Sequence, residues 1–248
     1  MAPEVERLVA YIRRTISGLE AAKLENEYEY SCVPLCIIDA VFSMGVRYES
    51  TRRTVREFCT KHRWGISRSE AVIEHTVSEF LQILAPFENQ FESADVFRNK
   101  QRTSSRSGIT KAESVYRFSK TLQRYEIETF SDALSRGKNP RLKEAVRGIP
   151  GQSSGISFAY FLILVGHRDV VKPDRMIRRF VAAAIGRATI SQDYVDELVV
   201  SASDALIDEL PNLVPAVLDN AIWKYQRGAP PAGADQMFTR HAFIRKRR

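Results

Sequence analysis

Asp174 is the residue whose position in the sequence best fits a catalytic role. It follows Pro173, which favours an extended backbone, and it precedes the run Arg-Met-Ile-Arg-Arg-Phe, so we expect it to begin a helix. The positive end of a helix stabilises an ionised carboxylate at this position. An ionised carboxylate suits a reaction in which positive charge develops on a sugar ring. Asp174 could also serve only as a helix N-cap, and the two roles are compatible.

A glycine-bearing turn lies upstream of Asp174, in the run Gly-Ile-Pro-Gly-Gln-Ser-Ser-Gly at 148–155. Backbone N–H groups at such a turn, and at the helix start that follows it, can hold a phosphate without any side chain. The candidate phosphate-binding positions are Gly151, Ser153 and Gly155. Ordinary helix connections use glycine too, so the turn becomes informative only together with other features.

A basic, polar segment at 98–111 reads Arg-Asn-Lys-Gln-Arg-Thr-Ser-Ser-Arg-Ser-Gly-Ile-Thr-Lys and predicts a loop. Such a loop could embrace phosphates, or it could be a solvated connector. The candidate DNA-binding cations are Arg102, Arg106 and Lys111, together with Arg178 on the helix that Asp174 begins.

Composition limits the class of protein and its partners. The 248 residues carry a net charge of +7, with 44% hydrophobic and 27% charged residues, which indicates a compact globular chain that attracts anionic partners. Its 3 cysteines cannot build a four-cysteine zinc or iron–sulfur site, and its 4 histidines show no paired ligand spacing. We therefore expect no metal and no cofactor.

Two further features bear on the location of the protein. The longest apolar stretch, Phe158 to Val165, is too short to cross a bilayer, so we expect no membrane contact. The start of the chain contains Glu4 and Glu6 and lacks the apolar core of a secretory signal. These features favour a cytoplasmic, nucleoid-associated protein in a bacterium or a nuclear protein in a eukaryote.

Helical periodicity dominates the chain, and no segment alternates as a strand would. Apolar residues recur at helical spacing from Met1 to Ile16, which predicts an amphipathic first helix. We expect further helices at 35–42 and on through 54–59, from a Ser69 cap to Leu81, and at 111–122, 140–146, 157–165, 175–186, 192–210 and 213–225. The expected fold class is all-α.

Three of these motifs together resemble the helix-hairpin-helix superfamily of DNA glycosylases. The run Ile-Pro-Gly at 149–151 is similar to that family's Leu-Pro-Gly-Val-Gly hairpin. At a matching separation, Val-Lys-Pro-Asp-Arg-Met-Ile-Arg-Arg at 171–179 is similar to its Val-Pro-Val-Asp-Thr-His-Val-x-Arg signature. Upstream, Gly-Ile-Thr-Lys-Ala-Glu-Ser-Val at 108–115 resembles its Gly-x-x-x-Lys-Ala-x-x-Ile helix start. The resemblance covers roughly residues 31 to 187.

The resemblance implies a monomeric protein that binds double-stranded DNA, rotates a modified or damaged base out of the duplex and hydrolyses its N-glycosidic bond. Asp174 matches the catalytic aspartate, which would either stabilise the sugar cation or activate a water molecule. Gly155 or its neighbour Ser154 stands where bifunctional relatives have a lysine nucleophile, so we expect a monofunctional enzyme without lysine-dependent cleavage of the abasic site. Repair of damaged bases and defence against phage with hypermodified bases both fit this activity.

The resemblance also suggests where a side chain would replace the extruded base. The segment Ile-Asp-Ala-Val-Phe-Ser at 38–43 is similar to the helix that ends in the family's wedge element, and the wedge position falls near Gly45. The candidates for wedge or base pocket are Ser43, Arg47, Tyr48 and Trp223. Arg47 and Tyr48 could equally be ordinary surface residues. Trp223, four residues after Asp219, could equally be a packing residue beside a surface acid.

The resemblance further implies two helical lobes with the DNA cleft between them. We expect residues 31–144 in a helical-barrel lobe and residues 1–30 plus 145–228 in the lobe that carries the hairpin and Asp174, followed by a flexible basic tail at 229–248. An alternative on the same fold is a noncatalytic DNA-binding or lesion-recognition protein. A helical interaction module without a DNA role is the third hypothesis.

Overall fold

The structure is a computed structural model that describes residues 2–24, 29–91, 96–104 and 108–228. Within these residues there is no strand, only isolated bridges between Tyr30 and Ser67 and between Arg102 and Thr110. The expected all-α fold class is confirmed. In the same ranges no helix has the length and apolar character needed to cross a membrane. Two sequence predictions, on Arg106 and on the tail 229–248, lie outside the described residues.

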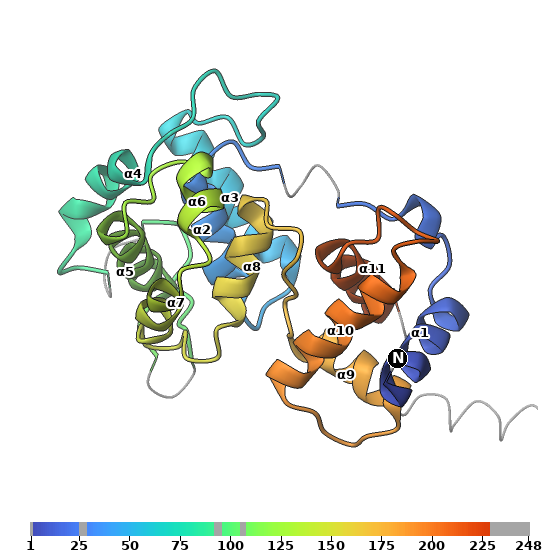
Figure 1. Cartoon of the computed structure of the whole chain (residues 1–248). Helices are drawn as coiled ribbons and strands as arrows, with labels where there is room; N and C mark the ends of the chain where they lie inside the picture. Colours follow the sequence, from blue (N-terminus) through green and yellow to red (C-terminus); the bar gives the residue numbers. More distant parts are fainter. Residues whose placement is uncertain (1, 25–28, 92–95, 105–107, 229–248) are drawn as a thin grey trace, which may run out of the picture.

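Buried apolar side chains form two clusters, and the helices divide between them (Figure 1). The first cluster contains residues of α2 (Val33–Phe42), α3 (Tyr48–His62), α4 (Val77–Leu84), α5 (Lys111–Arg124), α6 (Phe130–Arg136), α7 (Pro140–Arg147) and α8 (Ile156–Val165). Its central helix is α2, which packs against α3, α5 and α8. All ten residues of α2 are buried, which explains why this segment is apolar on every face.

The second cluster brings the beginning of the described chain against its end. It contains residues of α1 (Pro3–Thr15), the short 3-10 helix η1 (Leu19–Ala21), α9 (Arg175–Ile185), α10 (Gln192–Leu206) and α11 (Pro215–Gly228). The amphipathic α1 packs its apolar face on α9 and α10, while α11 packs on α9 (Figure 1). The segment 166–174 connects α8 in the first cluster to α9 in the second.

The position of α8 defines where the first cluster ends along the chain. The side chains of α8 pack in the first cluster, where Phe158 and Phe161 lie against Phe118 of α5 with ring centroids 6.3 and 5.2 Å apart. The apolar faces of α7 and α8 thus stay with the helices that precede them. The change of core comes in the connection after Val165.

Two helix predictions need correction. Ser69 does not cap a helix, because α4 begins at Val77 after Thr76, whose side chain accepts from the backbone N–H of Glu79 in a capping box. The expected continuous run from 35 to 59 is also interrupted, since α2 ends at Phe42 and α3 begins at Tyr48. The interruption contains Gly45 with φ +68°, a conformation that glycine adopts without strain.

Candidate functional site

Asp174 is the N-cap of α9, as its sequence context predicts. Its Oδ1 accepts hydrogen bonds from the backbone N–H groups of Met176 at 2.7 Å and Ile177 at 3.2 Å. Its Oδ2 makes no hydrogen bond or ion pair with any residue that the structure describes. The side chain is partly exposed. One carboxylate oxygen is thus used in holding the helix, and the other is available to a ligand.

Lys172 lies two residues before Asp174 and is held by its backbone. Its N–H donates to Oδ1 of Asp219 at 3.0 Å, and its Nζ lies 3.5 Å from the centroid of the Tyr160 ring. Desolvation lowers the pKa of the amine, and the negative charges of Asp174, Asp39 and Asp219 oppose that effect. The amine of Lys172 therefore lies over the Tyr160 ring of α8 and interacts electrostatically with three carboxyl groups.

Asp39 is the most deeply buried of these carboxyl groups, with 0% exposure on the central helix α2. Its Oδ2 accepts from three tyrosine hydroxyls: Tyr30 at 2.8 Å, Tyr160 at 3.3 Å and Tyr48 at 3.4 Å. Its Oδ1 has no hydrogen-bond partner among the described residues. Burial raises the pKa of Asp39 to about 6, although the tyrosine hydrogen bonds and the charge of Lys172 act in the opposite direction.

Asp219 supplies the third carboxyl group, from α11. It is buried, with 7% exposure. Desolvation, and then the negative charge of Asp174, raise its pKa well above the ordinary value, against the hydrogen bond from the Lys172 amide. Burial therefore favours the neutral acid at Asp219, as it does at Asp39. The alternative in which Asp219 is a surface acid beside a packing Trp223 is therefore wrong.

Tyr48 and Trp223, both expected near a base pocket, are in contact. Their ring centroids lie 6.1 Å apart at an interplanar angle of 78°, an edge-to-face arrangement. Arg227 lies over the Trp223 ring at 5.1 Å and forms an ion pair with Glu49. These contacts join the start of α3 to the end of α11, so they connect the two core clusters beside Asp39.

The other two wedge candidates lie in the break between α2 and α3. Ser43 is the C-cap of α2, is partly exposed and donates from Oγ to the carbonyl of Ala40 at 3.3 Å. Arg47 is the exposed N-cap residue of α3 and directly precedes Tyr48. The hydroxyl of Tyr48, by contrast, reaches one of the three carboxyl groups, that of Asp39.

The glycine turn at 148–155 is anchored to the first cluster. Gly151 has φ +85°, and a Cβ built there would lie 2.3 Å from Cβ of Thr103, so the turn packs closely on the basic loop. Gly155 has φ +74° and is the N-cap of α8. Ser153 is exposed, and its carbonyl accepts from Nε of Arg147 at 2.9 Å. Gly151 and Ser153 are both exposed, and residue 151 must be glycine because of its positive φ and its close approach to Thr103.

The candidate cations occupy different environments. Arg102 is exposed and donates from Nε to the carbonyl of Gly108 at 2.8 Å. Arg178 is partly buried, and its guanidinium donates to the carbonyl of Ile190 at 3.2 and 2.9 Å. Lys111 is only 2% exposed. Its position in the interior contrasts with the surface contact expected from the sequence.

Lys111 uses its whole ammonium group inside the protein. Its Nζ donates to the carbonyls of Phe42 at 2.9 Å and Met44 at 2.8 Å and to Oε1 of Gln101 at 3.0 Å. Burial lowers the pKa of this amine to about 8. The residue holds the end of α2 and the start of the break that leads to Tyr48, a positioning role that charge patterning did not indicate.

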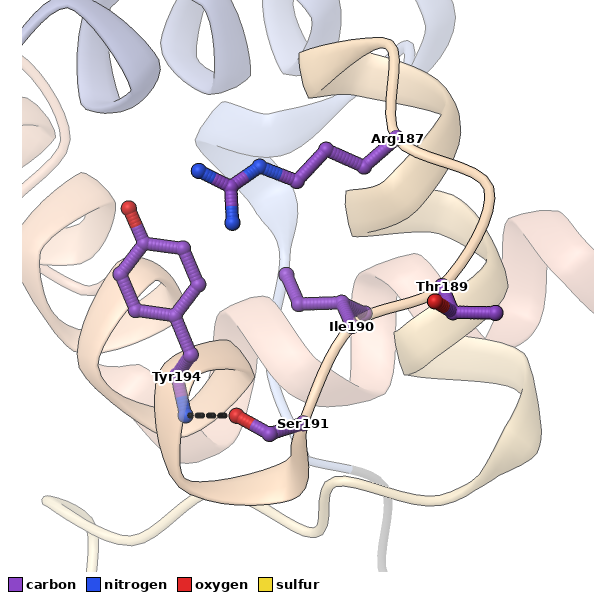
Figure 2. Close-up of a pocket in the computed structure, with 5 residues that line it drawn as sticks. All are labelled: Arg187, Thr189, Ile190, Ser191 and Tyr194. Atoms are coloured by element: carbon purple, nitrogen blue, oxygen red, sulfur yellow. Dashed lines mark hydrogen bonds between the residues drawn. The ribbon is translucent and has the colours of Figure 1, made fainter.

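Two cavities of the structure are lined by none of the three carboxyl residues. A surface hollow of about 480 Å³ is lined by Arg187, Thr189, Ile190, Ser191 and Tyr194 (Figure 2). There Ser191 caps α10 by accepting from the N–H of Tyr194 at 3.3 Å, and Arg187 forms an ion pair with Glu4 at 2.8 Å. A second cavity, of about 400 Å³, lies between η1 and α11. No group of three His, Cys, Asp or Glu side chains in the described ranges is arranged to hold a metal ion.

Sequence reasoning missed four residues of this site. Asp39, Tyr160, Lys172 and Asp219 come from three helices and a connection, and the chain distances between them hide their proximity. A signal was present for Asp39, because an acid in the middle of the apolar run Val33–Phe42 must be buried with a partner or a special role. No comparable signal marks the other three.

Comparison with known proteins assigns the chain to a family. A search of curated proteins finds no match, and a search of solved structures also finds none. A family model described as a domain of unknown function, DUF8548, matches residues 6–227, which include all three carboxyl groups and both core clusters except Val5. The chain is a member of the DUF8548 family.

Proposed function

We propose that this protein is a DNA N-glycosylase that excises a modified or damaged base and leaves an abasic site. The observation that carries the proposal is that only one of the two oxygens of the Asp174 carboxylate is hydrogen-bonded. Oδ1 caps α9, while Oδ2 of this partly exposed residue has no hydrogen-bond partner among the described residues. A carboxylate held rigidly by a helix end, with one oxygen available, suits the stabilisation of positive charge at C1′ of a sugar.

The aromatic residues around Asp39 suit the recognition of an extruded base. Tyr48, Tyr160 and Trp223 come from three helices and approach Asp39 or each other. Aromatic faces stack on bases, and carboxyl groups accept hydrogen bonds at a base edge, or donate them where burial keeps the acid neutral, as it favours at Asp219. Unstacking a base costs a few kcal/mol, which contacts between the protein and phosphates must offset.

The proposed reaction breaks the C1′–N bond, and the bonding electron pair leaves with the base, which takes up a proton. Water adds to C1′ and loses a proton, so the products are a free base and an abasic sugar. Asp174 either faces the developing cation or accepts the proton from water, and both roles require an oxygen near C1′. The Oδ2 atom is our candidate for that oxygen.

We propose that DNA lies across the border between the two core clusters, in the two-lobed arrangement of helix-hairpin-helix glycosylases. Support comes from the origin of the site residues: Asp39 and Tyr160 belong to helices of the first cluster, while Asp174 and Asp219 belong to helices of the second. The exposed backbone at Ser153 and the exposed Arg102 are candidate phosphate contacts.

The test is Asp174→Asn, with DNAs that carry different lesions or hypermodified bases and with released bases identified by mass spectrometry. Asparagine is as good an N-cap as aspartate, so the free energy of unfolding should change little. We expect the variant to bind DNA and to lose base release. Base release by the variant at the wild-type rate would refute the role of Asp174.

A noncatalytic lesion-recognition protein is the second candidate. It is favoured by the full burial of Asp39 and by the positions of the cavities, neither of which adjoins Asp174. Salt-dependent binding to duplexes, with no base released from any DNA tested, would support this candidate over base excision.

A further inference from the structure

We propose that an extended segment of the chain and the exposed side of α3 form one surface that binds the phosphate backbone of a nucleic acid. The surface consists of Arg53 and Arg56 on α3 and of Lys100 and Arg102 on the segment 99–104, and we call it the basic strip. All four side chains are exposed. The inference deepens the proposed function and rests on it for the choice of a nucleic acid as the anionic partner.

The segment 99–104 turns its side chains alternately inward and outward. Asn99, Gln101 and Thr103 are partly buried, whereas Lys100 and Arg102 are exposed. In an extended chain, side chains two residues apart point to the same face and lie about 6.6 Å apart along the chain. The two cations of the segment therefore face solvent on the same side.

Backbone hydrogen bonds hold the segment in this extended form. The N–H of Thr103 donates to the carbonyl of Ile109 at 2.9 Å, and the N–H of Lys111 donates to the carbonyl of Gln101 at 2.7 Å. The bridge formed by residue 102 lies between these two bonds. A segment fixed in this way can bind an anion without the entropic cost of ordering a free loop.

Side-chain hydrogen bonds also align the segment with α3. Nδ2 of Asn99 donates to Oγ1 of Thr54 at 2.9 Å, and Nε2 of Gln101 donates to Oγ of Ser50 at 3.3 Å. Ser50 and Thr54 are one helical turn apart, so the segment runs along the helix and in the opposite direction.

This alignment brings the cations of the two elements together. Arg53 directly precedes Thr54, and Lys100 directly follows Asn99, so the bond between Thr54 and Asn99 places the two cations at neighbouring positions. Arg56 lies three residues after Arg53, on the same exposed side of α3. The basic strip therefore combines charges that are far apart in the sequence.

The acids of α3 leave the positive charge of the basic strip in excess. Glu49 forms an ion pair with Arg227, and Glu57 is partly buried. Among the residues that the structure describes, Arg53 and Lys100 form no ion pair. Exposed cations gathered on one face attract a polyanion, and arginine in particular binds phosphate oxygens in pairs.

The basic strip leads to the glycine turn at 148–155. Thr103 follows Arg102, and a Cβ built at Gly151 would lie 2.3 Å from Cβ of Thr103, so the segment and the turn are in close contact. Ser153 on that turn is exposed. A chain of phosphates could contact both the basic strip and the turn, which a small anion could not do.

The experiment measures the binding of the full chain to a labelled, unmodified DNA duplex by fluorescence anisotropy at several salt concentrations. We expect the double variant Arg53→Gln, Lys100→Gln to weaken binding by about tenfold and to lower the slope of log Kd against log salt by about 2, because two phosphate contacts are lost. The matched control is Lys120→Gln, Arg124→Gln, which removes the same charge from exposed positions of α5 and should leave the slope unchanged.

A further variant tests the orientation of the segment without changing the charge. Asn99→Ala keeps the net charge of +7 but removes the bond to Thr54 and the bond from the N–H of Gln101 to Oδ1 of Asn99 at 3.0 Å. It should weaken binding, by less than the double variant does. The substituted cations are exposed, so the thermal unfolding midpoints of the charge variants should stay close to that of the wild type.

Four outcomes would overturn the inference. An unchanged slope in the double variant would mean that its cations touch no phosphate, and an equal loss in the control would mean that only net charge matters. Failure of the wild-type protein to bind the duplex would remove the partner. Displacement of the duplex by polyglutamate at an equal concentration of negative charge would assign the basic strip to an acidic protein instead.

The same experiment separates this inference from the proposed function, because binding to an unmodified duplex requires no base excision. A slope that falls in the double variant, with no base released from any DNA, would retain the basic strip and refute the glycosylase. Base release that depends on Asp174, with wild-type DNA binding by the double variant, would retain the glycosylase and refute the basic strip.

Discussion

The backbone N–H of Lys172 donates to the carboxyl group of Asp219 at 3.0 Å, and this bond ties the segment before α9 to α11. It links residues 47 positions apart in the sequence. Because Asp174 follows Lys172 closely, the bond also fixes where the N-terminus of α9 lies relative to Trp223 on α11. The carboxyl group that accepts this bond is buried, so a substitution that removes the acceptor would leave the Lys172 N–H without a partner.

Replacement of Asp219 should separate hydrogen bonding from charge. Asp219→Asn keeps an oxygen acceptor for the Lys172 amide and resembles the neutral acid that burial favours, so it should unfold at nearly the wild-type urea concentration. Asp219→Leu leaves that amide without its partner and should cost about 1–3 kcal/mol. Equal stability of the two variants in urea unfolding at pH 7 would contradict this account.

Asp39 should make stability depend on pH in the acid range. Its pKa is raised from 3.8 to about 6 in the folded protein, so the folded state holds a proton that the unfolded state has already lost. The contribution of Asp39 is therefore most favourable below about pH 4 and is lost as the pH rises through about 6. Asp39→Asn removes this dependence.

The measurement for Asp39 is urea unfolding of both proteins from pH 4 to pH 7. Because each pKa unit corresponds to about 1.4 kcal/mol, the stability of Asp39→Asn relative to wild type should rise by about 3 kcal/mol between about pH 4 and about pH 6. Above that range the difference should be constant. A difference that does not vary with pH would show that Asp39 titrates normally.

The two left-handed glycines of the turn at 148–155 should respond differently to alanine. Gly155→Ala meets only the Arg147 side chain, at 3.6 Å, so it should cost about 1–2 kcal/mol for backbone strain alone. Gly151→Ala suffers the same strain and also places Cβ 2.3 Å from Cβ of Thr103, so it should cost clearly more. Thermal unfolding ranks the two variants, and Thr103→Gly should recover part of the loss in Gly151→Ala. A larger loss in Gly155→Ala would reverse the expected packing.

Lys111 should be essential for the stability of the first cluster. Lys111→Met has a similar shape but leaves three acceptors, the buried carbonyl of Phe42, the carbonyl of Met44 and the side chain of Gln101, without their donor. Loss of a buried, fully hydrogen-bonded charge should cost about 3 kcal/mol or more. Calorimetry checks the loss, and Lys120→Met on an exposed face of α5 is the control. A stable Lys111→Met would mean that water replaces the amine.

Local sequence signals predict a helix end well where the interactions that form it lie within that one helix. The cap at Asp174 is a relation between a side chain and two following amides, so the residues at 174–177 suffice to predict it. The start of α4 was misplaced because both Ser69 and Thr76 are acceptable caps. The capping box with Glu79 favours Thr76, and Val72 and Ile73 remain exposed.

The composition of the site could not be predicted in the same way. Tyr160 meets Asp39 across 121 positions, and the partners of Lys172 and Asp219 depend on how α8, α9 and α11 pack. Hydrophobic periodicity indicates which face of a helix is buried, but not which helix covers it. A lysine in the connection at 166–174 therefore looked unremarkable until the fold placed it over Tyr160.

Trp223 should report the opening of the site when DNA binds. The chain has 2 tryptophans, and Trp64 stacks on His75 within the first cluster, so Trp64→Phe leaves Trp223 as the single fluorophore. Because Asp39 is fully buried and accepts from the hydroxyl of Tyr48, which contacts Trp223, we expect a base to reach it through opening of the Tyr48–Trp223 contact. We expect a larger change in Trp223 emission with a duplex that contains an extruded or abasic nucleotide than with an intact duplex.

Glu49→Gln, which weakens the ion pair with Arg227, should lower the duplex concentration needed for half of that change, because less free energy is spent on separating α3 from α11. If both duplexes change the emission equally, or if Glu49→Gln has no effect on the midpoint, the contact between Tyr48 and Trp223 does not control access to Asp39.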